Sequence, residues 1–84
     1  MSYPVIQFMR PIEAAGGGIE FKKADKQINS PEKLTGLIND IGSDVWFMSE
    51  KAREGTSGET MAVFLEYTAG AIAFVSAVLE KENH

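Results

Sequence analysis

Two carboxylates with helical spacing are the chain's best candidates for chemistry. Asp40 and Asp44 lie four residues apart, so on a helix they would share one face and could hold a divalent cation. Calcium and magnesium take about six to eight oxygen ligands, which two carboxylates on one helix do not supply. A glycosidase-type acid pair needs a cleft with one carboxyl buried, and so short a chain offers little room for one. We therefore expect neither a metal site nor a catalytic pair here.

Other reactive groups are scarce. The chain has no cysteine, which excludes disulfides, zinc–thiolate sites and thiol chemistry. Its one histidine, His84, is the last residue, and a chain end is a poor place to hold a catalytic base. The glycines at 16–18 could cradle a phosphate, but no Gly-Lys-Ser/Thr follows them and the next segment has strand alternation. We expect a non-enzymatic protein with no cofactor.

The net charge of -4 is unevenly distributed. Residues 1–33 carry five basic and four acidic side chains, whereas residues 34–84 carry three basic and eight acidic ones. The acidic part repels nucleic-acid phosphates and anionic lipid headgroups, and it favours a protein partner with a basic surface. Solubility alone is the other explanation of this charge. We expect no direct binding to nucleic acid.

One segment is apolar enough to raise the question of a membrane. From Met61 to Leu79 the only charged residue is Glu66, and the uncharged run of residues 67–79 is 13 residues long. A spanning helix needs roughly 18 or more, so we expect a buried core helix and no membrane. The first dozen residues lack the basic and apolar regions of a secretory signal, which predicts a cytoplasmic protein.

The elements that must position these side chains begin with a β-hairpin at about residues 5–23. The apolar run at residues 5–9 has the composition of a strand. In residues 19–22 the alternation places Ile19 and Phe21 on the core face and the intervening charged residues in water. The three glycines between the two runs allow the chain to reverse direction.

A first helix is predicted at about residues 31–54. Ser30 is a preferred N-cap residue, and Pro31 fits the first helical position. Apolar residues then recur every three or four positions, and Gly55 ends the pattern.

A second helix is predicted at about residues 58–81. Thr56 and Glu59 have the spacing of a capping box at its start. Because the linker is short, the two helices must form an antiparallel hairpin. The expected fold is therefore α+β, ββαα in order, with residues 1–84 as a single domain (hairpin about 5–23, helical hairpin about 31–81).

The helices are expected to meet through one apolar interface. The residues predicted to face one another are Leu34, Ile38, Ile41, Val45 and Met48 on the first helix and Phe64, Leu65, Ile72, Val75 and Leu79 on the second. The second helix is apolar over half its circumference, so we expect burial on more than one side. Its small residues, Ala62, Ala69, Gly70, Ala73 and Ala77, would admit either the hairpin, which we favour, or a second copy of the chain. Trp46 beside Gly42 is expected in the core.

The exception to this pattern is an aromatic residue among charges on the first helix. At about 100° per residue, one quadrant outside the apolar stripe contains Asp40, Asp44, Phe47, Lys51 and Glu54. An apolar side chain ringed by carboxylates is typical of a binding anchor, so we predict that Asp40, Asp44, Phe47 and Glu54 contact a partner. The alternative is that the hairpin covers this quadrant and Phe47 belongs to the core.

The whole profile resembles small phage inhibitors, above all the anti-CRISPR proteins: a short, cysteine-free, acidic chain with no catalytic motif. The resemblance covers the chain's overall character and no motif. It implies a phage or mobile-element inhibitor that binds a Cas protein or surveillance complex through an acidic surface. Two alternatives stay open. One is an antitoxin or immunity protein that neutralises a basic toxin, and the other is a self-associating structural protein, such as a homodimer.

Overall fold

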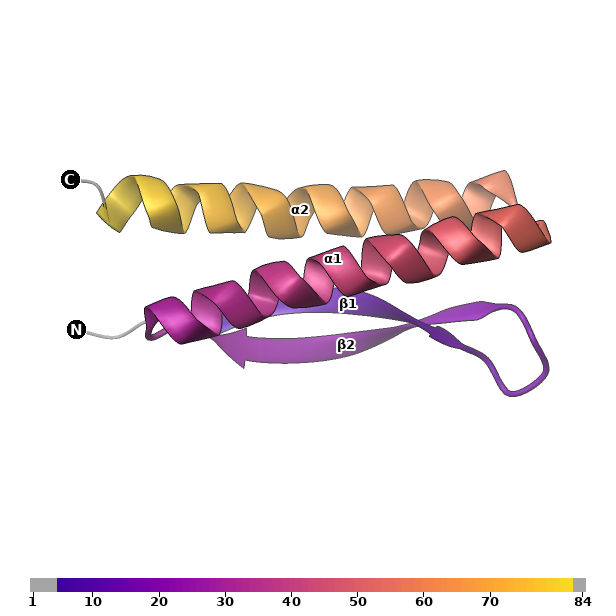
Figure 1. The fold of residues 1–84 in the computed structure, drawn as a ribbon, viewed down its shortest axis with the longest axis horizontal. Helices are drawn as coiled ribbons and strands as arrows, with labels where there is room; N and C mark the ends of the chain where they lie inside the picture. The colour runs from indigo at the N-terminus through magenta and orange to yellow at the C-terminus, as the bar shows by residue number, and fades with distance from the viewer. Residues whose placement is uncertain (1–4, 83–84) are drawn as a thin grey trace.

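The structure, a computed structural model that describes residues 5–82, has two antiparallel strands followed by two helices. The elements are β1 (Val5–Glu13), β2 (Ile19–Gln27), α1 (Pro31–Glu54) and α2 (Gly58–Glu82). Figure 1 shows the helices side by side along the long axis, with the β-hairpin lying along them. The molecule measures 44 × 20 × 18 Å. The predicted α+β fold of ββαα order is confirmed.

The β-hairpin is longer than its apolar runs predict. β1 continues through Pro11, which pairs with Phe21, and β2 continues to Gln27. A proline is tolerated because every second N–H of a strand in a two-stranded sheet points to a free edge. At the turn, Gly17 and Gly18 have φ values of 87° and 83°, which non-glycine residues rarely adopt. The strands twist strongly and cross in the view of Figure 1.

The first helix begins and ends where its sequence predicts. The Ser30 hydroxyl accepts a hydrogen bond of 3.2 Å from the Lys33 backbone N–H, and Pro31 occupies the first turn. At the other end Gly55 has a φ of 104°, and its N–H donates to the carbonyl of Ala52. Both termini therefore satisfy backbone groups that the helix leaves without internal partners.

The second helix has a different N-cap from the predicted one. The Ser57 hydroxyl accepts from the Thr60 N–H at 3.2 Å, so Ser57 caps α2. Thr56 instead donates its hydroxyl to the carbonyl of Lys51, at the end of α1. The capping box of Thr56 and Glu59 was wrong because two neighbouring hydroxyl residues compete for this position, and the first of them is used by the preceding helix.

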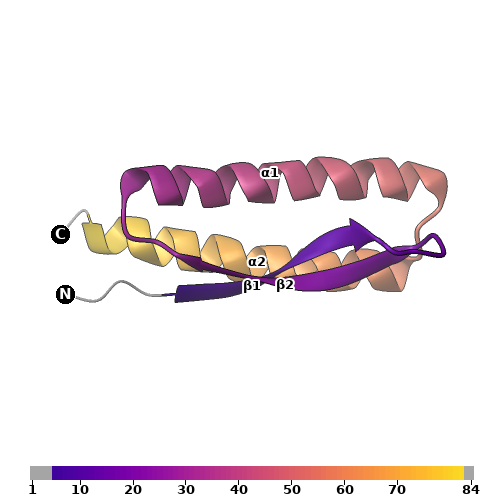
Figure 2. The same cartoon turned by 90° about the horizontal axis from the view of Figure 1, so that it is seen from below.

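The core lies where the hairpin, α1 and α2 meet. Its buried residues are Ile6, Phe8, Ile28, Leu34, Leu37, Ala71 and Val75, with Ala24, Ile41, Phe74 and Val78 packed against them. Figure 2, seen from below, shows α1 to one side while the hairpin overlies α2. The hairpin therefore approaches both helices, and a second contact to α2 is the edge-to-face pair of Phe21 and Tyr67, with ring centroids 5.3 Å apart.

Much of the predicted helix–helix interface is on the surface instead. Leu34, Met48, Phe64 and Val75 are buried and Ile41 is partly buried, but the remaining residues are exposed, namely Ile38, Val45, Leu65, Ile72 and Leu79. The expectation was wrong for the three residues of α2 because the hairpin packs on the opposite side of that helix, through Ala71 and Phe74. As a result, the side of α2 that carries Leu65, Ile72 and Leu79 faces solvent. The expectation was wrong for Ile38 and Val45 because the hairpin approaches α1 on the side of Asp40 and Asp44.

Two further expectations of burial were wrong. Trp46 is 69% exposed, and a side chain added at Gly42 would meet no atom within 4 Å. On α2 the small residues predicted to sit under the hairpin, Ala62, Ala69, Gly70, Ala73 and Ala77, are all exposed. Among the described residues, α2 is the one helix long and apolar enough to cross a membrane, yet only 17% of its apolar stretch is buried. The second helix thus contributes Phe64, Ala71 and Val75 to the buried residues and leaves most of its apolar stretch exposed.

Candidate functional site

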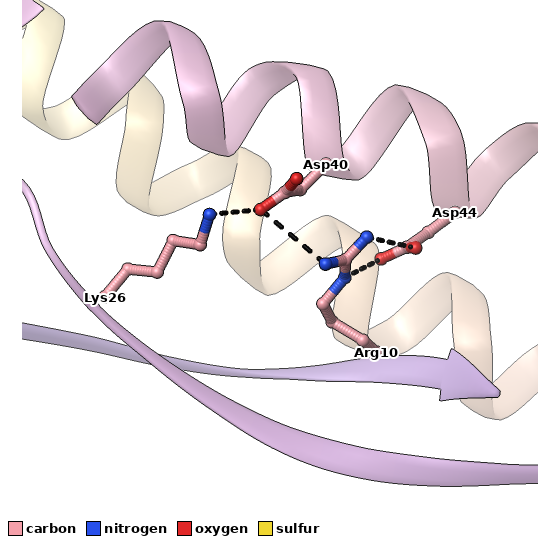
Figure 3. A network of polar contacts seen from close by, with 4 residues as sticks. All are labelled: Arg10, Lys26, Asp40 and Asp44. Atoms are coloured by element: carbon pink, nitrogen blue, oxygen red, sulfur yellow. Dashed lines mark hydrogen bonds and ion pairs between the residues drawn. The ribbon is translucent and has the colours of Figure 1, made fainter. Parts of the chain in front are cut away.

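The two acids with helical spacing face the β-hairpin rather than solvent. Asp44 is 8% exposed and accepts two hydrogen bonds of 3.0 Å from Arg10, one from Nε and one from Nη2. Figure 3 shows the Arg10 guanidinium on β1 facing this carboxylate of α1, with two contacts between them. The bond to Asp44 raises the pKa of Arg10, and burial opposes that rise only in part. Such a two-point pair fixes both the distance and the orientation of its partners.

Asp40, one turn earlier on α1, completes a four-residue network. Its Oδ2 accepts from the ammonium of Lys26 on β2 and lies 3.7 Å from Nη1 of Arg10. Two cations thus face two carboxylates across the space between hairpin and helix (Figure 3). The four charges cancel, so the acids are neutralised by residues that lie 14 and 34 positions away in the chain.

The register of the hairpin explains why these cations reach α1. Arg10 follows Ile6 and Phe8 at a spacing of two, so it lies on the face of β1 that enters the core. Lys26 is the cross-strand partner of Ile6 and lies on the same face. Neither residue was predicted from the sequence to belong to the site. Because alternate residues of a strand share a face, Ile6 and Phe8 place Arg10 on the core face. A cation there has to pair with an acid, and this signal could have identified Arg10.

Phe47 is half-buried, and the ammonium of Lys51 lies over its ring. The ammonium of Lys51, one turn later, lies 5.5 Å from the centre of the Phe47 ring. The same ammonium contacts Glu13 of β1 at 3.0 Å and Glu54 at 3.7 Å. The hydrogen bond to Glu13 is the main cause of the raised pKa of Lys51. This second cluster ties the far end of β1 to the last turns of α1.

The four residues predicted to bind a partner therefore already have contacts within the chain. Asp40 and Asp44 pair with the hairpin, Glu54 pairs with Lys51, and Phe47 lies beneath Lys51. Their place corresponds to the alternative in which the hairpin covers this quadrant. Their role in binding stays a prediction, but a basic partner would have to displace Arg10 and Lys26 to reach the two aspartates.

A different, uncharged surface is exposed along both helices. Each helix carries exposed residues at alternating spacings of three and four, and we call the two sets together the outer seam. On α1 they are Thr35, Ile38, Gly42, Val45, Ser49 and Ala52, and on α2 they are Ala62, Leu65, Ala69, Ile72, Ser76 and Leu79. None is charged. This spacing has the 3.5-residue repeat of helices that pack along their length on other helices.

The outer seam lies on the side of the helical pair that faces away from the hairpin. On α1, Ile38 is about 160° around the helix from Asp40, which contacts β2. On α2, Leu65 is about 160° from Tyr67, which contacts Phe21. Both helices thus direct one side to the hairpin and the opposite side to solvent. The exposed fractions of Leu65 and Ile72 are 60% and 51%, values that neither residue would have in a core.

Comparison of the chain with protein families, with curated proteins and with solved structures found no match. Within residues 5–82, no three His, Cys, Asp or Glu side chains lie close enough together to hold a metal ion. Among the described residues, the outer seam and the ion-pair network are therefore the two features that bear on function.

Proposed function

We propose that the chain is a non-enzymatic protein-binding domain and that its binding surface is the outer seam. The observation that carries the proposal is the exposure of Ile38, Val45, Leu65, Ile72 and Leu79 at regularly spaced positions of both helices, among uncharged seam residues. Large contiguous apolar surfaces are uncommon on soluble monomers and mark sites where another molecule binds. The seven-residue spacing favours a helical partner, because the knobs and holes of such a surface fit a second helix.

The seam changes the proposed mode of action from the one that charge alone predicts. An inhibitor that covers a Cas protein or surveillance complex is still our proposal for the wider role, with an antitoxin as its alternative. The acids of α1 pair with the hairpin in the structure, so the seam, and not those acids, is the surface through which we propose that the chain associates. Leu65 and Ile72 are then the anchors of binding, in place of Phe47.

A photo-crosslinking residue tests the surface in the native host. We would place it at Ile72, in the seam, and at Ala77, which is exposed on the same helix about 140° away. Protein adducts from position 72 and none from position 77 would support the proposal. Equal adducts at both positions, or none at either, would contradict it.

A further inference from the structure

We infer that the outer seam is occupied by a second copy of this chain, giving a two-fold symmetric dimer with a four-helix core. The inference rests on the proposed function, because it names the partner that the seam binds. In this dimer the two helical hairpins stack through their outer sides, and the β-hairpins lie on the outside.

The first support is that the seam is complementary to itself. The large residues recur at every seventh position, as Ile38 and Val45 on α1 and as Leu65, Ile72 and Leu79 on α2, and the next such position on α1 is Ala52. The positions between them are small, namely Thr35, Gly42 and Ser49 on α1 and Ala62, Ala69 and Ser76 on α2. One surface thus carries both the knobs and the holes. A two-fold axis brings the same surface of a second copy against it, so each large residue can fit beside small ones.

The second support is the number of helices. An isolated pair of antiparallel helices has two long sides, and the hairpin covers only one side of this pair. Two further helices on the open side complete a four-helix bundle, the arrangement in which helices with this spacing commonly pack. Since α1 and α2 are antiparallel, a two-fold axis that runs along the pair or across it always places antiparallel helices opposite each other.

The third support is the size of the surface. A 24-residue helix is about 36 Å long, and two helices side by side are about 20 Å wide, in keeping with molecular extents of 44 × 20 × 18 Å. The outer side therefore has a projected area of about 700 Å², comparable with the roughly 800 Å² of accessible surface that each partner contributes to a standard stable interface. The outer side is thus about as large as the surface that one partner contributes to a stable dimer.

The charges of α2 make a membrane a poorer partner for the outer seam than a second copy of the chain. Glu66 and Glu80 lie at the two ends of the uncharged run of α2, and the chain's net charge is -4. Helices that lie on a membrane surface are rich in Lys and Arg on their polar side, which anionic headgroups attract, whereas the one basic residue of α2 is Lys81. To span the membrane, α2 would also have to leave the core to which Ala71 and Val75 belong.

The test is the mass of the full chain in solution. Sedimentation equilibrium from about 1 to 100 µM should show the mass rise to twice the chain's 9.2 kDa. Ile72→Glu places a charge in the seam and should stay at the monomer mass at every concentration. Ala77→Glu adds the same charge on the same helix, outside the seam, and should dimerise like the parent. Circular dichroism checks that each variant is folded. If Ile72→Glu fails to fold, Val45→Glu tests the seam from α1.

Trp46 provides an independent readout. It is the chain's one tryptophan and lies on α1 at the border of the seam, 69% exposed. Its emission should shift to the blue with increasing concentration, with the same midpoint as the mass, and Ile72→Glu should abolish the shift.

Three results would overturn the inference, and they separate it from the proposed function. If the parent chain is a monomer at 100 µM but crosslinks from position 72 to a different protein, the seam binds protein and the second copy is wrong. If the parent chain is a monomer that sediments with phosphatidylcholine or phosphatidylglycerol vesicles while Ile72→Glu does not, both proposals are wrong. If Ala77→Glu loses the dimer as fully as Ile72→Glu does, the interface is not the seam.

Discussion

Arg10 and Asp44 lie 34 residues apart in the sequence, and their side chains meet in an ion pair with two contacts of 3.0 Å. The pair joins β1 to α1 and buries most of the Asp44 carboxylate. It fixes the hairpin to one side of the helical pair, and so it also determines which side of the helices stays open.

Removing one partner of this pair should destabilise the domain. Asp44→Ala leaves Arg10 partly buried without its acceptor, and we expect the free energy of unfolding to fall by about 2 kcal/mol in urea titrations. The exposed pair of Glu50 and Arg53, at 2.8 Å, is the control. Glu50→Ala should cost less than about 0.5 kcal/mol. Equal losses from the two variants would show that the Asp44 pair contributes no more than a surface pair.

Truncations in the core and in the seam should respond differently to protein concentration. Leu37 is fully buried, so Leu37→Ala should cost about 2 to 5 kcal/mol at any concentration. Ile72→Ala should cost less than about 1 kcal/mol at 1 µM, because half of this side chain is in water. At 100 µM its cost should be larger, since the parent chain then gains stability from association. A cost for Ile72→Ala that does not change with concentration would contradict the seam dimer.

Two glycines of the helical hairpin should respond to alanine with opposite signs. Gly55 ends α1 with a φ of 104°, where an L side chain is strained, so Gly55→Ala should lower the stability by about 1 kcal/mol. Gly36 lies inside α1, and a β-carbon there meets no atom within 4 Å. Gly36→Ala should raise the stability by about 0.5 to 1 kcal/mol. Thermal melting of both variants decides this, and a stabilising Gly55→Ala would disprove the role of Gly55 as the C-cap.

The ion pairs of Lys51 with Glu13 and Glu54 should make the domain less stable at alkaline pH. The bond to Glu13 raises the pKa of Lys51 above its ordinary value of 10.5. A base whose pKa is raised by folding contributes stability that is fully present below that ordinary value and is lost as the pH rises through the folded value. We therefore expect the parent chain to lose this contribution above pH 10.5.

Variants of Lys51 and its neighbours test whether the loss of stability at alkaline pH comes from Lys51. Lys51→Gln and Glu13→Gln should each remove that part of the alkaline loss, measured as the difference in unfolding free energy between neutral and alkaline pH. Arg53→Gln, which alters a neighbouring exposed pair, should keep it. If Lys51→Gln has the same pH profile as the parent chain, the loss comes from another group.

The sequence predicted the elements well because their signals are local. Ser30, Pro31 and Gly55 act on backbone groups within one turn of themselves, so they set the ends of α1 wherever the helix packs. The alternation at Ile19 and Phe21 likewise describes a strand before any partner is present. The cap of α2 was the local error, since Thr56 and Ser57 are both suitable and only the geometry of the preceding turn chooses between them.

The side-chain environment was predicted less well because it depends on which surfaces meet. The apolar residues of α2 extend over half its circumference, and periodicity alone does not say which part the hairpin covers. The pairs of Arg10 with Asp44 and of Phe21 with Tyr67 decide that, and they join residues far apart in the chain. They place Ile72 in water and Asp44 inside, the reverse of what the sequence led us to expect.

By itself the sequence determined the α+β order, the two turns and the ends of α1, together with the absence of cysteine chemistry and the acidic balance. The tertiary structure decided that the acids of α1 serve the hairpin and that an uncharged seam along both helices remains open. The physical reason is that hydrogen bonds within a turn are fixed by neighbours in the chain. The burial of a side chain is fixed by the element that packs on it, and that choice is made between segments far apart in the sequence.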